Sequence, residues 1–422
     1  MTFSWMTYFV GVLLVLLQVL AALPWIVLTF AGRDTRAAWR RRPFGSDMLP
    51  LYGGVLAIVL LVPALFQYMV REGSALEVWG QIYGAVLQLQ LLADAFILIF
   101  ALLLLVWPKG GAIALAAFRE GVRQPMFWLL FGVAFVAMTI SPLIPYFTFG
   151  EDHLVVKEIG IDTIMLIAAV FGALAASMSI SEEIEGRTAV TLMSKPVSRR
   201  HFLIGKFVGI VLAAAVFFAL LGTYFEGIAL FKHWWDKMDT PWWSKELDSR
   251  VAESAPQWVS AMLEKWALPG EATDLLRGVG LWTHLTLDTA PGLVLGFSQV
   301  MVLIAIAVSL ATRVPMVVNL VTVVVIFFLA HLTPVLVSIG YEAQRTNPGA
   351  VVSQILYFMA QLFDLLLPNL ESFRLEPALL NDTPLSAVDF TKYLGSVSLY
   401  GLLYTSIILL FGLILFEDRD LA

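Results

Sequence analysis

Residues 207–225 read FVGIVLAAAVFFALLGTYF, a run of 19 residues without a single charged side chain. A helix needs about 20 mostly apolar residues to cross the hydrocarbon core of a membrane. Within lipid, a helix satisfies its own backbone hydrogen bonds, which an open chain cannot do. Eight further stretches have the same character: 9–31, 51–70, 83–107, 126–148, 163–180, 292–312, 315–333 and 394–416. The sequence therefore predicts an all-α polytopic membrane protein with about nine transmembrane helices.

The composition supports this class and excludes several others. Of the 422 residues, 59% are hydrophobic and 14% are charged, against about 45–50% and 25% in soluble domains. The formal charge of −6 is too small to indicate a nucleic-acid partner. There is no cysteine, and no two of the five histidines are four residues apart, so no metal site is predicted. Because hydrolase motifs are also absent, no catalytic residue is predicted.

The basic residues predict the orientation of the chain. A nine-span topology with the N-terminus outside and the C-terminus in the cytoplasm places 15 of the 26 Lys and Arg residues inside. This distribution follows the positive-inside rule, whereas ten spans would put a basic segment on the wrong side. We therefore read 351–367 as an amphipathic interfacial helix and not as a tenth span. The inside segments are 32–50, 108–125, 181–206, 313–314 and the C-terminal tail.

Two of the predicted outside loops are large. The first, 226–291, holds seven of the 13 tryptophans, and the second, 334–393, contains the 351–367 helix. Tryptophan prefers the membrane–water boundary, so these loops predict interfacial helices resting on the outer leaflet. An aromatic surface that meets a substrate or an extracytoplasmic partner is the alternative.

A break at residues 108–111 follows the first three spans and divides the chain into a three-span region, 1–110, and a six-span unit, 111–422. The amphipathic stretch 117–125 leads into the fourth span. It fits an interfacial elbow that begins the six-span unit, and it fits a plain cytoplasmic loop equally well.

The inside loop 181–206 carries the strongest functional signal. Gly186 can end the preceding membrane helix, and Thr188 can cap a new short helix of about 189–194. Pro196 stops that helix, and Ser198 can cap the next span. A short apolar helix exposed at the inner face needs a docking partner, and a groove in a peripheral protein is the natural one. The basic residues that follow, Arg199, Arg200 and Lys206, are expected to meet lipid headgroups.

At this loop the sequence resembles a known family. The runs E-E-I-E-G-R-T at 182–188, L-M-S-K-P-V-S-R-R at 192–200 and I-G-K at 204–206 are similar to the cytoplasmic coupling loop of ABC-2 type transporter permeases. The resemblance extends over 112–422. Further similar segments are 118–123, 309–313, 368–371 and 416–421. The chain departs from the family in the insertion of Arg187 before Thr188 and in its three extra N-terminal spans.

The resemblance implies a function. The chain would be the permease subunit of an ABC exporter in the bacterial cytoplasmic membrane, and would not itself be an enzyme. A separate ABC ATPase subunit would bind MgATP and dock on the coupling loop, and this chain has no phosphate-binding G-x-x-x-x-G-K-[ST] loop of its own. One six-span unit per chain implies a homodimer or a pair with a related permease. The expected ATPase-coupling residues are Glu183, Glu185, Gly186, Arg187, Thr188, Leu192, Pro196 and Arg199.

Two other functions stay open from the sequence. A non-transporting mechanical coupler would transmit ATPase work to an extracytoplasmic partner through the two large outside loops. An ion-coupled secondary transporter is suggested by Asp94, which lies one turn after Gln90 inside the third predicted span. A carboxylate in a membrane helix usually faces the protein interior. Gln90 and Asp94 therefore form either an intramembrane polar site for a proton or ion, or part of an interhelical hydrogen bond.

Overall fold

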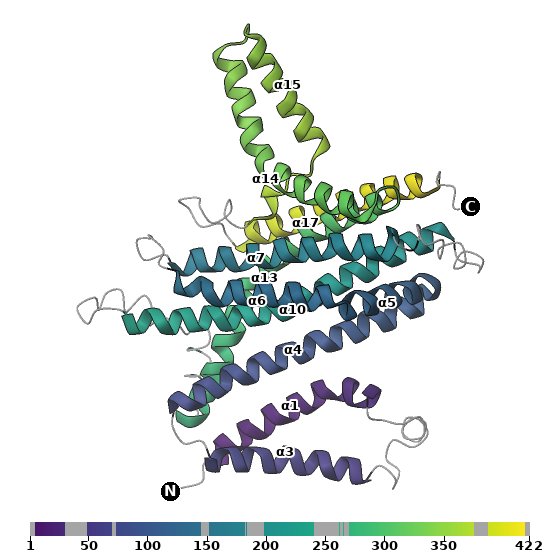
Figure 1. Cartoon of the computed structure of the whole chain (residues 1–422). Helices are drawn as coiled ribbons and strands as arrows, with labels where there is room; N and C mark the ends of the chain where they lie inside the picture. Colours follow the sequence, from purple (N-terminus) through teal and green to yellow (C-terminus); the bar gives the residue numbers. More distant parts are fainter. Residues whose placement is uncertain are drawn as a thin grey trace. The chain divides into compact units, whose positions relative to one another are not determined.

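The computed structural model describes residues 5–29, 49–69, 73–144, 152–181, 183, 198–239, 261, 265, 270–374 and 387–417. These residues form helices and no strand, which confirms the predicted fold class (Figure 1). The α-helices are α1 (Trp5–Thr29), α3 (Leu49–Met69), α4 (Gly73–Val106), α5 (Pro108–Arg123), α6 (Pro125–Ile140), α7 (Asp152–Ala176), α10 (Arg199–Asp239), α13 (Gly270–Ala311), α14 (Met316–Thr346), α15 (Val351–Leu366) and α17 (Ala387–Glu417). Short 3-10 turns lie at Ser141–Leu143 and Glu371–Phe373, and a π-helix lies at Ser177–Ser181.

Each of the nine predicted spans overlaps a helix of the structure, although several predicted ends extend past the helix ends. Among the described residues, eight helices are long and apolar enough to cross a membrane by length and composition. The predicted span 51–70 lies in α3, whose apolar part, Gly53–Tyr68, is shorter than those eight. The multi-pass architecture is therefore confirmed, with eight helices in place of nine meeting the length requirement.

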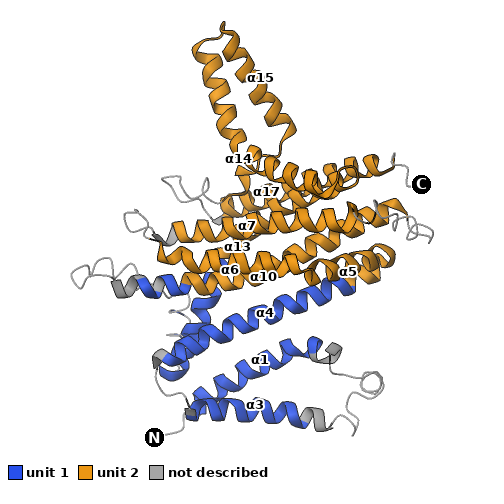
Figure 2. Ribbon diagram, in the orientation of Figure 1, with its two compact units in different colours: residues 1–101, 230–288 blue, residues 102–229, 289–422 orange. Residues whose placement is uncertain are grey.

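The chain divides into two compact units (Figure 2). Unit 1 comprises residues 1–101 and 230–288, and unit 2 comprises residues 102–229 and 289–422. Much of the predicted outside loop 226–291 thus groups with the N-terminal helices. The functional division into a three-span region, 1–110, and a permease unit, 111–422, stays a prediction.

Unit 1 is held together by close helix contacts and by hydrogen bonds between spans. Gly80 of α4 lies against the backbone of α13 at Leu275 and Gly278, so neither helix has room for a side chain at that crossing. About two turns further along α4, Gln88 accepts a hydrogen bond of 2.6 Å from the indole N–H of Trp282. Small residues that let backbones meet are typical of helix packing in membranes.

Unit 2 has a dense aromatic and aliphatic core. Phe127, Phe171 and Phe217 come from α6, α7 and α10, and their ring centroids are 5.1–5.7 Å apart. The second half of α13 is almost fully buried among the other helices of the unit. The end of α7 and the start of α10 frame the predicted coupling loop.

The predicted interfacial helix 351–367 corresponds to α15, which pairs with the second half of α14. Gly340 of α14 contacts Ala360 of α15, and the rings of Tyr341 and Tyr357 meet edge to face at 5.2 Å. Figure 1 shows this hairpin projecting from the other helices of unit 2. Its position at a membrane interface remains a prediction.

Candidate coupling site

The structure describes two of the eight predicted coupling residues, Glu183 and Arg199. The other six lie outside the described residues: Glu185, Gly186, Arg187, Thr188, Leu192 and Pro196. The short helix predicted at 189–194 lies outside them as well. The site can nevertheless be built from the two stems of the loop, which are the end of α7 and the start of α10.

The first stem is the π-helix Ser177–Ser181, which continues α7. The side-chain amide of Asn319 on α14 donates to Ser177 Oγ at 2.8 Å and to the carbonyl oxygen of Ala307 on α13 at 2.9 Å. Ser181 Oγ donates to the carbonyl of Ala311, at 3.1 Å. Single π turns inside helices occur often at functional sites. Here the π-helix bonds the first stem of the loop to the end of α13 and the start of α14.

The second stem begins with a helix cap. The backbone N–H of His201 donates to Ser198 Oγ at 3.3 Å, which confirms the predicted cap of this span. Next to it, Arg199 Nη1 donates to the carbonyl oxygens of Phe416 and Glu417 at 2.6 and 2.7 Å. Arg313 Nε donates to the carbonyl of Leu415 at 2.8 Å. Two guanidinium groups therefore satisfy the last carbonyls of α17, where the helix dipole also favours positive charge.

Lys206 connects the two stems. Its ammonium group donates to Glu183 Oε1 at 2.7 Å, to Ser179 Oγ at 2.7 Å and to Glu120 Oε2 at 3.4 Å. Ser179 Oγ in turn donates to Glu120 Oε2 at 3.1 Å. The Lys206 side chain is only 6% exposed, so the expectation that Lys206 meets lipid headgroups is wrong. A buried ammonium group is stable only when paired, and these two carboxylates supply the pairing. We call Lys206, Glu183, Ser179 and Glu120 the Lys206 cluster.

The elbow predicted at 117–125 belongs to a complete helix, α5, which is followed at once by α6. Its buried face consists of small residues: Gly110, Gly111, Ala114, Ala117 and Gly121. On α10, Gly205 and Gly209 meet this face. An added Cβ at Gly209 would collide with the carbonyl oxygen of Ala114 and lie 2.7 Å from Ala117 Cβ. The short distance between the α5 and α10 backbones brings Glu120 within reach of Lys206.

These contacts gather four separate inside segments of the predicted topology at one end of unit 2. They are 108–125 through Glu120, 181–206 through Glu183 and Arg199, 313–314 through Arg313, and the end of α17. The nine-span arrangement requires all four to share one side of the membrane. That this side is the cytoplasm stays a prediction.

Sequence reasoning missed the polar residues that anchor the first stem. Ser177, Ser179, Ser181 and Asn319 are all buried. Two signals pointed to them: three serines spaced two apart at the end of an apolar run, and one asparagine in an apolar span. A polar side chain within a membrane helix usually faces protein, so Asn319 in particular could have been assigned to a helix contact.

The intramembrane pair Gln90 and Asp94 belongs to unit 1. Gln90 Oε1 accepts a hydrogen bond of 2.6 Å from Gln18 Nε2 of α1, so an interhelical contact does form at this level. Asp94 Oδ1 is buried and has no hydrogen-bond partner among the described residues. Within the part of the chain that the structure describes, no group of three or more His, Asp or Glu side chains is placed to hold a metal ion.

The long apolar helices define a multi-pass membrane protein, and within unit 2 the Lys206 cluster joins α5, the end of α7 and α10. Residues 122–240 match the family model described as ABC-2 family transporter protein. This matched segment includes the predicted coupling loop and both of its stems, and the match supports an ABC-2 type permease. The comparison found no matching protein of curated function and no matching solved structure.

The family match has direct consequences for the class of activity. It supports a permease component of an ABC transporter, which is a membrane subunit and not itself catalytic. It also implies association with an ABC ATPase subunit.

Proposed function

We propose that the chain is the permease subunit of an ABC exporter in the bacterial cytoplasmic membrane. A separate ATPase subunit carries MgATP and docks on the loop 181–206. The observation that carries this proposal is the Lys206 cluster, which joins the two stems of the loop to α5. When both stems of a loop are bonded to packed helices, a displacement of the loop by the ATPase also displaces those helices. A loop without such bonds would move without displacing them.

Movement of the docked loop reaches the rest of unit 2 by three routes. Glu120 carries it to α5, Asn319 carries it through the π-helix to α14, and Arg199 carries it to the end of α17. Each route is a short chain of hydrogen bonds between packed helices, the kind of contiguous contact that couples distant sites. The permease works as a homodimer or beside a related chain, because one such unit supplies half of a two-fold transporter.

Charge reversal in the loop tests the docking proposal. Glu185→Lys, or deletion of 188–194, is expected to lower the amount of ATPase that co-purifies with the permease by about tenfold, the loss of one or two charged contacts. The measurement is quantitative co-purification of a co-expressed ABC ATPase subunit, with membrane insertion of the permease checked in parallel.

The matched control for charge reversal is Glu342→Lys. Glu342 is an exposed acid on α14, in the predicted outside segment, and its replacement should leave ATPase recovery unchanged. Full ATPase recovery with both loop variants would show that the coupling loop is assigned incorrectly.

A mechanical coupler is the second candidate, and the α14–α15 hairpin favours it. The hairpin carries many large exposed apolar side chains, among them Val351, Val352, Ile355, Phe358 and Leu365. A projecting apolar surface of this kind is typical of a contact with another protein or with lipid.

Cross-linking distinguishes the two candidates. A photoreactive residue in place of Trp234, which is 54% exposed near the end of α10, should capture only lipid if the chain is a simple exporter. Capture of one soluble extracytoplasmic protein, in stoichiometric yield, would support the coupler. The same probe at exposed Trp128 of α6 serves as the control for nonspecific labelling.

A further inference from the structure

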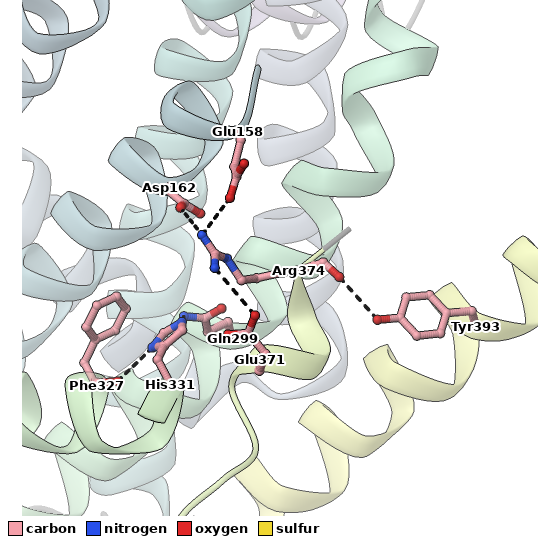
Figure 3. Close-up of polar contacts among 8 residues, drawn as sticks. All are labelled: Glu158, Asp162, Gln299, Phe327, His331, Glu371, Arg374 and Tyr393. Atoms are coloured by element: carbon pink, nitrogen blue, oxygen red, sulfur yellow. Dashed lines mark hydrogen bonds and ion pairs between the residues drawn. The ribbon is translucent and has the colours of Figure 1, made fainter. Parts of the chain in front are cut away.

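A second polar cluster lies near the start of α7, 15 residues before the π-helix and therefore about 22 Å along the helix axis from it. Its centre is the guanidinium group of Arg374, on the segment that follows the α14–α15 hairpin (Figure 3). Arg374 Nη2 donates to Asp162 Oδ2 at 2.6 Å and to Glu158 Oε1 at 2.9 Å. Arg374 Nη1 lies 3.5 Å from Glu371 Oε1. One cation thus serves three carboxylates.

The three carboxylates are not equivalent. Glu371 lies on the same turn as Arg374 and stays beside it wherever that turn moves. Glu158 and Asp162 lie one turn apart on α7, where two negative charges repel each other unless a cation sits between them. Burial by itself lowers the pKa of Arg374, but the carboxylates of Asp162, Glu371 and Glu158 outweigh burial and raise it. The acid pair on α7 is therefore paired with a cation that comes from another segment of the chain.

A buried amide completes the arrangement. His331 Nδ1 donates to the carbonyl oxygen of Phe327 at 2.8 Å, so His331 Nε2 is left to accept from Gln299 Nε2 at 3.3 Å. This contact fixes the amide orientation of Gln299, which is fully buried on α13. Gln299 Oε1 then has no hydrogen-bond partner among the described residues. Figure 3 shows this oxygen on the side of the amide that faces Glu371 and Arg374. A buried acceptor without a donor is rare and asks for a ligand that can donate.

We propose that Glu158, Asp162 and Gln299 Oε1 bind the ammonium group of an organic cation, and that Arg374 is a tethered occupant which this group displaces. The proposal rests on the proposed permease function and names the substrate class as amine-bearing molecules. The two carboxylates are 42% and 39% exposed, so a ligand from water can reach them. The three carboxylates and the Arg374 guanidinium sum to a net charge of −2, which disfavours an anionic ligand. Among the described residues, no group of three or more His, Asp or Glu side chains is placed to hold a metal ion, and here Arg374 lies between the carboxylates.

Displacement also has a structural consequence. Arg374 bonds the 371–374 turn to α7 through Glu158 and Asp162, whereas Tyr393 of α17 holds the same turn through the carbonyls of Ser372 and Arg374 at 2.7 and 3.3 Å. When an ammonium group replaces the guanidinium, the turn remains on α17 and separates from α7. Occupancy of the site is thereby converted into a change in helix contacts.

Binding of n-hexylammonium to the purified full chain in lipid nanodiscs tests this proposal, with n-hexanol as the neutral probe of equal length. Arg374→Gln removes the tethered competitor and should tighten hexylammonium binding about tenfold, the value of one charge-assisted contact. The double variants Arg374→Gln with Asp162→Asn, and Arg374→Gln with Gln299→Leu, should lose that gain. Lys392→Gln is the matched control, because Lys392 is a neighbouring exposed cation paired to Asp389 at 3.3 Å.

Several outcomes would overturn the proposal: no gain with Arg374→Gln, equal gain for hexanol, or stronger binding of Ca²⁺ than of hexylammonium at matched ionic strength. If Arg374→Gln does not fold, Gln299→Leu in the otherwise unchanged chain is the second test and should weaken hexylammonium binding about tenfold. No ATPase or nucleotide is present in these measurements. Failure here therefore contradicts the substrate class alone, and failure of ATPase co-purification contradicts the permease proposal alone.

Discussion

Replacing Gly209 by alanine is expected to destabilise the chain, although alanine is the better helix former. The new Cβ would collide with the carbonyl oxygen of Ala114, and backbone cannot move aside as a flexible side chain can. Overpacking of this kind costs about 1–3 kcal/mol, which exceeds the gain of about 1 kcal/mol in helix propensity. The measurement is the apparent Tm of the purified protein in detergent, which should fall.

The control is the same substitution on the same helix. A Cβ added at Gly227 of α10 meets no atom within 4 Å. Gly227→Ala should therefore leave Tm unchanged or raise it, by the helix propensity gain of about 1 kcal/mol. The two variants should thus shift Tm in opposite directions. Equal shifts would show that α5 and α10 do not pack backbone to backbone at Gly209.

Replacing Lys206 by methionine is expected to weaken both the fold and ATPase association. Methionine keeps most of the side-chain volume but removes the ammonium group that pairs Glu183 and Glu120. Breaking a buried pair by removing one partner costs about 3–5 kcal/mol, and the partial exposure of these carboxylates puts the expected cost below that range, at about 2 kcal/mol. Lower Tm and lower ATPase co-purification should appear together, because the same cluster holds both loop stems.

Two further variants separate a loss of pairing from a general effect of losing charge. Lys392→Met breaks an exposed pair and should cost about 0–1 kcal/mol. Adding Glu183→Gln to Lys206→Met removes the unpaired carboxylate and should recover part of the lost stability. A double variant as unstable as Lys206→Met alone would mean that Glu183 and Lys206 do not act as a pair.

The identity of the membrane helices was predictable because it depends on local composition. A run such as 207–225 has only one stable state in lipid, and helix capping by Ser198 follows from residue type and position. The family resemblance of 181–206 was readable for the same reason, since its motif is contiguous in the chain. The family match over 122–240 agrees with that reading.

The partners of the charged residues were not predictable. Lys206 was assigned to lipid because, in a linear sequence, a basic residue at the end of a span has no other visible partner. One of its actual partners, Glu120, is 86 residues away, and Arg199 reaches α17 across more than 200 residues. Such pairs depend on which helices pack together, and periodicity within one helix carries no information about that.

The sequence alone therefore determined the class of protein and the approximate positions of its spans, and it predicted the location of the coupling loop, because hydrophobicity and short motifs act locally. Tertiary structure alone decided that α5 packs closely against the glycines of α10 and that Lys206 is buried between the two loop stems. It also decided that Arg374 lies between two carboxylates of α7. The physical reason is the same in each case. The stability of a buried charge or of a bare glycine face depends on the atoms that neighbouring helices bring to it, and only packing in three dimensions supplies them.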